Sequence, residues 1–380
     1  MCPDVVIIGG GIIGCACAYY LSLEGVRVHV VEKGALASGA SKAGEGGIPA
    51  PERPGIRAKM AEAAGSMYRA LAAELPLDIE YQQEGTLFIA ETEEDLCVAK
   101  EDCRLIRAHG YRCELLDSQE VIDLEPNLAQ DVAGGVFYAD GGRINPHLVV
   151  LGLVEAARRR GAAIQTFTEV KGIELSNDGG SVQAVATTAG RIPVAAVVNA
   201  AGAWSGSIGR MVGLEVPIVP RKGYVLVTEP VSRLIHCTTV SEMGYTRAAL
   251  SGDEELLVAL EVEQPRSGNL LIGMSREFVG FDCAVSPQVI SAMVARHLRF
   301  FPSNTGVHLI RAYAGLRPYS PDNLPIISEA GTIEGFYVAT GHEGEGQGMA
   351  PITGKLVAQM ITGQKPDLPL GDLSLSRFTK

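Results

Sequence analysis

Residues 5–14, VVIIGGGIIG, decide the fold. The β-branched start of this stretch predicts a buried strand, and the residues that follow, up to Glu24, predict a helix. Between the two, Gly9, Gly11 and Gly14 fit the pattern GxGxxG. The first glycine permits a tight turn, the second lets a pyrophosphate approach the backbone, and the third lets the helix pack on the strand. The stretch therefore predicts the start of a dinucleotide-binding βαβ unit.

A carboxylate follows the second predicted strand, Val26–Val31. Glu32 comes 18 residues after Gly14, where a dinucleotide fold places the group that accepts hydrogen bonds from the ribose hydroxyls. A carboxylate at this position would repel a 2′-phosphate, so NADP is disfavoured. The alternative is a bare turn with a surface glutamate.

Two further glycine-rich stretches accompany this unit. Residues 38–48 read SGASKAGEGGI, and they predict backbone that wraps a large flat cofactor, with Ser38 and Ser41 near phosphate. The alternative is a flexible loop. Residues 341–348 read GHEGEGQG and lead into a helix. The dipole of that helix would stabilise negative charge on a reduced flavin at N1 and the C2 carbonyl, whereas the alternative is an ordinary acidic loop.

The composition excludes several classes of protein. The 380 residues carry 32 basic and 44 acidic side chains, and the net charge of −12 argues against a nucleic-acid partner. No apolar run approaches the ~18 residues of a membrane helix, so no transmembrane segment is expected. The apolar start has no basic flank, which argues against a signal peptide. The eight cysteines form no CxxC motif, so we expect no metal site and no disulfide framework, and a cytoplasmic location fits best.

The predicted elements divide the chain into two domains. Predicted helices cover 58–75, 93–109, 147–160 and 348–362, and predicted strands cover 163–175, 182–188, 192–199, 216–228 and 256–273. Helix–strand units recur at the start, middle and end of the chain, whereas 81–140 and 216–314 are richer in strands and turns. We therefore expect a discontinuous nucleotide-binding domain, made of 1–80, 141–215 and 315–380, and a strand-rich substrate-binding domain inserted as 81–140 and 216–314.

Two more motifs carry a family resemblance. Residues 197–205 read VVNAAGAWS and residues 314–325 read AGLRPYSPDNLP. Together with VVIIGGGIIG and the VVEKG of residues 30–34, they resemble the D-amino-acid oxidase superfamily, which includes glycine oxidase and sarcosine oxidase. The resemblance implies an α/β plus α+β fold: a Rossmann-like FAD-binding domain of the glutathione-reductase type, with an inserted antiparallel-sheet substrate domain. It also implies FAD as the cofactor and an amino-acid-like substrate.

A narrower resemblance concerns residues 270–280, LLIGMSREFVG, and the GHEGEG loop. These resemble the FAD subunits of multi-subunit amine dehydrogenases, such as opine oxidases, hydrogen cyanide synthase and the proline or hydroxyproline dehydrogenase complexes. The resemblance implies partner flavin and iron–sulfur subunits. The flavin is expected to be non-covalent, because Cys237 and Cys283 lie outside the AGLRP segment that carries the attachment cysteine in sarcosine-oxidase-like enzymes.

The family resemblance also implies which residues contact the cofactor. They are Gly9, Gly11, Ile12, Ile13, Gly14, Glu32, Lys33, Ser38, Ser41, Lys42, Gly46, Gly47, Val170, Ala201, Gly202, Trp204, Gly315, Arg317, Gly341, His342, Gly344, Glu345, Gly346, Gln347 and Gly348.

Arg317 is the leading substrate-binding residue, because its planar fork binds a carboxylate through two parallel hydrogen bonds. The matching arginine does this in glycine-oxidase-like enzymes. The alternative is an ion pair with a structural carboxylate such as Asp322. Two departures from glycine oxidase stand out: Glu261 falls where that family has a carboxylate-binding tyrosine, and Gly344 falls where it has a second arginine. Simple glycine oxidation is therefore not the expectation.

Further residues are candidates for binding the substrate or for catalysis. Glu261 and Glu263 alternate on one face of a predicted strand, where a carboxylate would hold a substrate amine or a cationic side arm, unless that face is simply solvated. Arg276 would supply a second cation for a dicarboxylate, or form a surface ion pair. Tyr245 would hydrogen-bond substrate from a polar turn. His342 would tune flavin charge or pass a proton, since histidine titrates near neutrality, or it has only a loop role.

These residues lead to one main function and two alternatives. The main one is FAD-dependent oxidation of the C–N bond of an amino acid or N-substituted amino acid (glycine, sarcosine, proline or opine-like), giving an imine that hydrolyses. A dehydrogenase is favoured over an oxidase, for which only Lys42 offers a cation near the flavin. The alternatives are a flavin-bearing subunit that turns over only with partner chains, and 2-hydroxy-acid oxidation with His342 as base.

Overall fold

The computed structural model describes residues 2–51, 54–244 and 256–378, so the predicted site residue Tyr245 lies outside the described residues. The N-terminal motif forms the centre of a six-stranded sheet with the order β18-β19-β12-β1-β2-β8. Its strands are β1 (Val5–Ile8), β2 (Val28–Val31), β8 (Ala163–Gln165), β12 (Ala196–Asn199), β18 (Ile326–Glu329) and β19 (Phe336–Thr340). β1 pairs in parallel with β2 and with β12, and only the edge strand β18 runs antiparallel.

Both faces of this sheet are covered, as expected for buried parallel strands. The helices are α1 (Ile12–Leu23), α2 (Ile56–Glu74), α5 (Pro146–Arg158) and α9 (Gly346–Ile361), with the short α6 (Ser205–Arg210) nearby. Val5 and Ile7 of β1 share a core with α1, α2 and α9. Val6 and Ile8 share a core with a three-stranded sheet, made of β9 (Val170–Leu175), β10 (Val182–Thr187) and β11 (Gly190–Pro193). The alternation of side chains along β1 thus places this strand between two hydrophobic cores.

The second large sheet has eight strands in the order β17-β13-β16-β15-β14-β4-β6-β5. They are β4 (Thr86–Ala90), β5 (Glu114–Asp117), β6 (Gly134–Tyr138), β13 (Val219–Pro230), β14 (Thr239–Glu242), β15 (Leu257–Glu263), β16 (Asn269–Arg276) and β17 (Leu309–Tyr319). All neighbours pair antiparallel except β4 and β14. The predicted fold class is confirmed. The division into two domains stays a prediction, and β17 runs across its boundary at residue 314.

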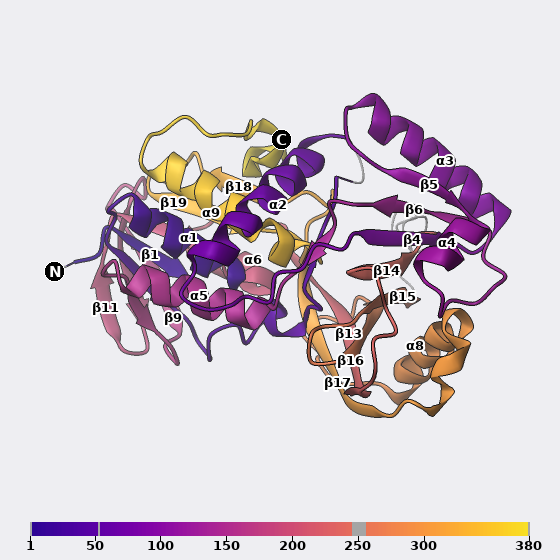
Figure 1. Cartoon of the computed structure of the whole chain (residues 1–380). Helices are drawn as coiled ribbons and strands as arrows, with labels where there is room; N and C mark the ends of the chain where they lie inside the picture. The colour runs from indigo at the N-terminus through magenta and orange to yellow at the C-terminus, as the bar shows by residue number, and fades with distance from the viewer. Residues whose placement is uncertain (1, 52–53, 245–255, 379–380) are drawn as a thin grey trace.

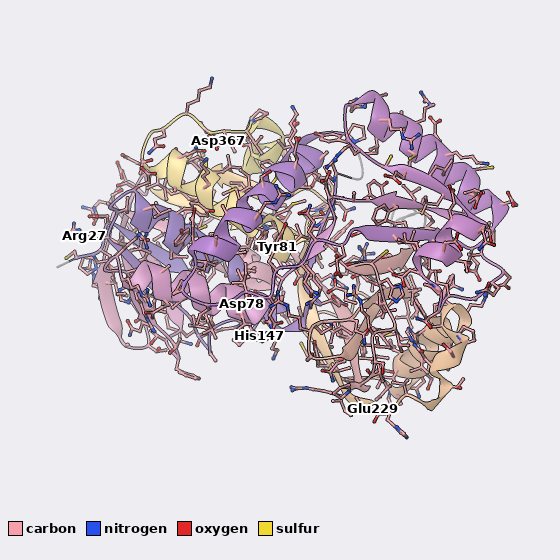
Figure 2. The ribbon with its side chains drawn as sticks, viewed as in Figure 1. Arg27, Asp78, Tyr81, His147, Glu229 and Asp367 are labelled. Carbon is pink, nitrogen blue, oxygen red and sulfur yellow. The ribbon has the colours of Figure 1, made fainter. Side chains whose placement is uncertain are left out.

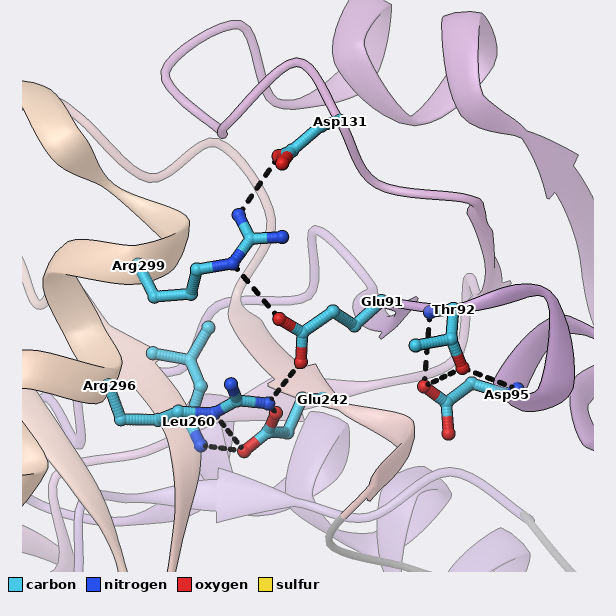
Figure 3. Close-up of polar contacts among 8 residues, drawn as sticks. All are labelled: Glu91, Thr92, Asp95, Asp131, Glu242, Leu260, Arg296 and Arg299. Atoms are coloured by element: carbon cyan, nitrogen blue, oxygen red, sulfur yellow. Dashed lines mark hydrogen bonds and ion pairs between the residues drawn. The ribbon is translucent and has the colours of Figure 1, made fainter.

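Among the described residues, α3 (Glu93–Ala108), α4 (Ser118–Leu124) and α8 (Pro287–Phe300) pack on the strand-rich half of the molecule (Figure 1). The sequence predicted α3, which begins with a capping box between Thr92 and Asp95, but it did not predict α8. α8 is held by charge as well as by packing. Arg296 donates to Glu242 and Glu91, and Arg299 bridges Glu91 (3.0 Å) and Asp131 (2.9 Å), as Figure 3 shows.

The connection between the two halves carries exposed polar side chains. Asp78 and His147 lie where the two halves of the ribbon meet in Figure 2, and the carboxylate of Asp78 lies 2.8 Å from the guanidinium of Arg266, between β15 and β16. A two-stranded ribbon of β3 (Gly47–Ile48) and β7 (Gly142–Arg143) lies at the same junction. Within the described ranges, no helix is long and apolar enough to span a bilayer.

Candidate active site

The two large sheets enclose a cavity of about 420 Å³. Its walls come from the N-terminal end of α1, the loop after β2, the turn after β12, the loop before α9, and strands β13 to β17. Because the carboxyl ends of parallel strands open at one edge of the sheet, this position is the one that α/β folds use for ligands.

The GxGxxG turn has the geometry that a pyrophosphate needs. Gly9 has a φ of +117°, and a side chain there would overlap the carbonyl of Ala200. A side chain on Gly14 would overlap the carbonyl of Gly9, so only glycine lets α1 begin this close to β1. Ser41 accepts a hydrogen bond from the backbone N–H of Ile12 (2.9 Å), which places its hydroxyl at the start of α1. Backbone donors and a hydroxyl thus meet where phosphates bind.

The ribose end of the cavity is also organised by side chains. Glu32 accepts hydrogen bonds from the backbone N–H groups of Gly10 and Gly34, each at 2.7 Å, so its carboxylate is fixed beside the glycine turn. The ammonium of Lys33 lies 3.5 Å from the centre of the Trp204 ring. Trp204 ends a single 3₁₀ turn that follows β12. This end therefore combines a hydrogen-bond acceptor with an aromatic surface, as an adenosine requires.

The far end of the cavity is lined by backbone from two glycine-rich loops. With its amide turned to satisfy both donors, Gln347 accepts from the N–H groups of Gly46 and Gly47 (3.0 and 3.1 Å). A side chain on Gly348 would overlap Pro49, so the two loops are in direct contact. The N-terminus of α9 points its free N–H groups into this region. A flat ring that gains negative charge on reduction fits this cradle.

The structure brings most of the predicted site residues to this cavity. Those that line it are Gly9, Gly11, Ile12, Ile13, Glu32, Lys33, Ser38, Ser41, Gly47, Val170, Ala201, Gly202, Trp204, Glu261, Arg276, Gly315, Arg317, His342, Gly344, Glu345, Gly346 and Gln347. Gly14, Lys42, Gly46, Gly341 and Gly348 are not among the lining residues. Gly14, Gly46 and Gly348 instead support the wall from behind, whereas Lys42 is exposed, and its place near the flavin stays a prediction.

One wall of the cavity is cationic. Arg317 of β17 donates to the carbonyl of Ser275 (2.7 Å), and a side chain on Gly223 of β13 would overlap its guanidinium. Arg276 of β16 and Arg221 of β13 lie 3.4 and 3.8 Å from the carboxylate of Glu343. Three guanidinium groups therefore surround one carboxylate, and the surplus of positive charge suits an anionic substrate group.

The charges of this wall control each other's protonation. Burial favours the neutral acid at Glu343, but Arg276, Arg317 and Arg221 hold its pKa below the usual range. Burial lowers the pKa of Arg276 to about 9, with Glu343 opposing that change and Arg317 adding to it. Arg276 is thus a buried cation and not half of a surface ion pair. Asp322, the alternative partner considered for Arg317, pairs instead with Arg377 (2.7 Å).

A second part of the cavity wall is acidic. Glu261 and Glu263 of β15 both face the cavity, so the alternative of a solvated strand face is wrong. Glu263 accepts from Arg143 and from Thr239, each at 3.2 Å, and Glu261 accepts from Ser241 at 3.1 Å. Glu45 joins them from the glycine-rich loop, with its side chain over Gly273 of β16. Burial raises the pKa of all three carboxyls, and that of Glu45 reaches about 7.

His342 differs from the expectation. Its Nε2 lies 2.9 Å from the hydroxyl of Thr353 in α9, and the side chain is buried. Burial and the nearby Arg57 lower its pKa to about 3, so the histidine is neutral near pH 7 and is a weak base. The expected titration near neutrality is therefore corrected.

Sequence reasoning missed three groups that complete the site. Glu45 stood in the quoted loop but was assigned no role, although a carboxylate within a run of glycines was a usable signal. Arg221 and Arg143 belong to no local motif. Arg221 reaches the cationic wall through the pairing of β13 with β17, and Arg143 reaches the acidic wall through its ion pair with Glu263. The described part of the chain places no cysteine in the cavity wall.

The fold and the site define a dinucleotide-binding oxidoreductase with charged groups in the wall of its cavity. Comparison with known proteins gives the family: the model described as FAD dependent oxidoreductase (DAO) matches residues 4–360, and the chain belongs to this family. FAD is accordingly its cofactor, and the glycine cradle, the helix N-termini and Glu32 are the groups that fit it. The chain is an FAD-dependent oxidoreductase of amino acids or amines.

Individual relatives match over nearly the whole chain. Glycine oxidase of Geobacillus kaustophilus is 31% identical, with 98% of this chain and 97% of the relative covered. Hydrogen cyanide synthase subunit HcnC of Pseudomonas protegens is 29% identical, with 99% and 96% covered. The crystal structure of L-proline dehydrogenase from P. horikoshii superposes with a TM-score of 0.90 at 25% identity, covering 99% of this chain and 97% of that one.

Proposed function

We propose that this protein oxidises the C–N bond of an amino acid or N-substituted amino acid, and that Arg317 binds the substrate carboxylate. The observation that carries the proposal is the cationic wall, where Arg317 and Arg276 line the cavity and outnumber the one carboxylate between them. A substrate carboxylate would balance this surplus charge. Relatives named glycine oxidase and L-proline dehydrogenase support an amino-acid substrate.

The residues of this chain would position the substrate for the reaction. Arg317 is fixed by its hydrogen bond to Ser275 O, so it presents its remaining donors in a fixed direction. A bidentate pair would orient the carboxylate and with it the Cα–H bond. FAD supplies the hydride acceptor at flavin N5. The imine product would then hydrolyse in water.

We further propose that the reaction is that of a dehydrogenase. Lys42, the lysine considered for oxygen activation, is exposed and lies outside the cavity wall. A dependence on partner chains is the second candidate. It is favoured by the relative named as a subunit of hydrogen cyanide synthase, which this chain matches over 99% of its length. The partners would be flavin and iron–sulfur subunits.

The decisive experiment is anaerobic visible spectroscopy of the purified holoprotein. A panel of amino acids, N-substituted amino acids, prolines, opines and 2-hydroxy acids is added in turn. Bleaching of the flavin by an amino acid is the expected result, and air is then admitted to compare reoxidation by oxygen with that by an artificial electron acceptor. A flavin that only a 2-hydroxy acid bleaches would overturn the proposal. A flavin that nothing bleaches until partner subunits are added would favour the second candidate.

A further inference from the structure

The acidic wall contains a buried carboxylate oxygen with no partner. Glu45 is only 7% exposed, and among the described residues nothing hydrogen-bonds to its Oε1. Leaving a buried acceptor unpaired is unfavourable, and more so if the group is charged. The two neighbouring carboxyls differ, because Glu261 accepts from Ser241 and Glu263 accepts from Arg143 and Thr239. Glu45 is therefore the lining residue of the acidic wall that has an unsatisfied carboxylate oxygen.

Strand β16 brings this carboxylate and Arg317 into the same region of the cavity. The side chain of Glu45 lies over Gly273, and Glu261 pairs directly with Gly273 across β15 and β16. The guanidinium of Arg317 donates to the backbone carbonyl of Ser275, two residues further along the same strand. Two residues of a strand span at most about 7 Å. Arg317, Glu45 and Glu261 all line the same cavity, and Arg317 is close enough to lower the pKa of Glu45.

A cation and a carboxylate in the wall of one cavity suit the head group of an α-amino acid. Its carboxylate and nitrogen are bonded to one carbon, about 2.5 Å apart. Adding a hydrogen bond of about 2.8 Å at each end gives a span of about 8 Å between the two protein groups. A zwitterion with its carboxylate on Arg317 would place its ammonium at Glu45. The cationic wall alone offers no partner for that ammonium.

We infer that Glu45, with Glu261 beside it, forms the subsite for the substrate ammonium, and that Glu45 takes one proton from it. One N–H bond of the ammonium breaks, an O–H bond forms on Glu45, and the electron pair stays on nitrogen. The neutral amine that results is the form from which the Cα–H hydride departs to FAD. This inference rests on the proposed function, and it adds a proton acceptor to it.

The surroundings of Glu45 suit this role. The charged and titratable groups that face it are Arg317 and Tyr313 of β17, Glu261 and Glu263 of β15, and Arg143. Burial raises the pKa of Glu45 to about 7, Arg317 lowers it, and Glu263 raises it further. A carboxyl that titrates near the working pH both accepts and releases a proton readily.

The first test measures the rate of anaerobic flavin reduction against pH, with an amino acid that bleaches the wild-type holoprotein. The wild-type rate is expected to rise with a midpoint near pH 7. In Glu45→Gln the midpoint moves up by at least one unit, toward the pKa of the free ammonium, whereas Glu45→Asp restores the wild-type midpoint. In Glu263→Gln it moves down, because a negative charge that raises the pKa of Glu45 is removed. An unchanged midpoint in Glu45→Gln overturns the inference.

The second test needs no oxidation, so it separates this inference from the proposed function. 2-Aminoisobutyrate has no Cα–H bond to break, and isobutyrate is the same molecule without the ammonium. Their dissociation constants are measured from perturbation of the flavin spectrum at pH 8. The wild type is expected to bind 2-aminoisobutyrate at least tenfold more tightly, and Glu45→Gln is expected to bind the two within threefold. Equal binding by the wild type, or binding of neither, overturns the subsite even if amino acids bleach the flavin.

Discussion

The two charged walls of the cavity differ in how their buried groups are protonated. On one wall three arginines surround Glu343. On the other, Glu45, Glu261 and Glu263 lie together, and only Glu263 forms an ion pair with Arg143. The arginines stay protonated at neutral pH, even at Arg276, where burial lowers the pKa to about 9. The first wall therefore keeps its charges there and holds the pKa of its one carboxyl low. Carboxyl groups do take up protons, so burial raises the pKa values of the second wall instead. The groups of the first wall therefore stay charged, whereas the carboxyl groups of the second wall bind protons more readily than usual.

The largest effect is expected from removing the single anion of the cationic wall. Glu343→Gln leaves three buried guanidiniums without their counter-ion, and breaking a buried pair in this way costs about 3–5 kcal/mol in the free energy of unfolding. Glu261→Gln is the matched control on the acidic wall. Its carboxyl has a raised pKa and is replaced by a neutral amide of the same shape, so a loss below about 1 kcal/mol is expected. Equal losses in urea denaturation would show that the two walls do not differ as described.

The pH dependence of stability tests the acidic wall directly. The pKa of Glu45 rises from an unfolded value near 4.5 to about 7, so the folded state binds more protons between these values. Its contribution to stability is full below pH 4.5 and is lost as the pH rises through 7. At about 1.4 kcal/mol per unit, the loss is up to about 3 kcal/mol. In thermal unfolding of the holoprotein, the Tm of Glu45→Gln should fall less steeply from pH 5 to 8 than the Tm of the wild type. Equal slopes for the two proteins would contradict the raised pKa.

Arginine substitutions distinguish the parts of the cationic wall. Arg317→Met removes the proposed bidentate grip on the carboxylate, and kcat/KM for the best amino acid is expected to fall about 100-fold. Arg221→Met is the control, because Arg221 contributes to the charge around Glu343 but does not line the cavity. A loss below fivefold is expected there. Steady-state kinetics with an artificial electron acceptor measures both, and similar losses would refute the role given to Arg317.

Alanine substitutions at two glycines are expected to have the smallest effects, each on one wall of the cavity. A side chain on Gly223 would displace Arg317, and one on Gly273 would displace Glu45. Because both neighbours are ends of flexible side chains, each alanine variant should fold, with an effect of about tenfold. Gly223→Ala is expected to raise KM at every pH, and Gly273→Ala is expected to slow flavin reduction mainly below pH 7. Identical pH profiles for the two variants would mean that the walls do not act separately.

Local sequence patterns predicted much of the scaffold. The β-branched run before Gly9 and the helix after Gly11 were identified correctly, because their periodicity and their glycines act over neighbouring residues. Helix α8 was missed although its apolar residues Val289, Met293 and Phe300 are buried. It was assigned to a strand-rich region, and its ion pairs join residues as far apart as Glu91 and Arg299.

The sequence by itself determined the class of cofactor, because the glycine turn and Glu32 interact with a ligand through a short continuous segment. The tertiary structure alone decided the charge layout of the substrate site. Arg221 and Arg317 become neighbours through the pairing of β13 with β17, and Glu45 reaches Glu261 from more than two hundred residues away. Burial then sets which of these groups keeps its proton, and burial is a property of the packed molecule that no local pattern encodes.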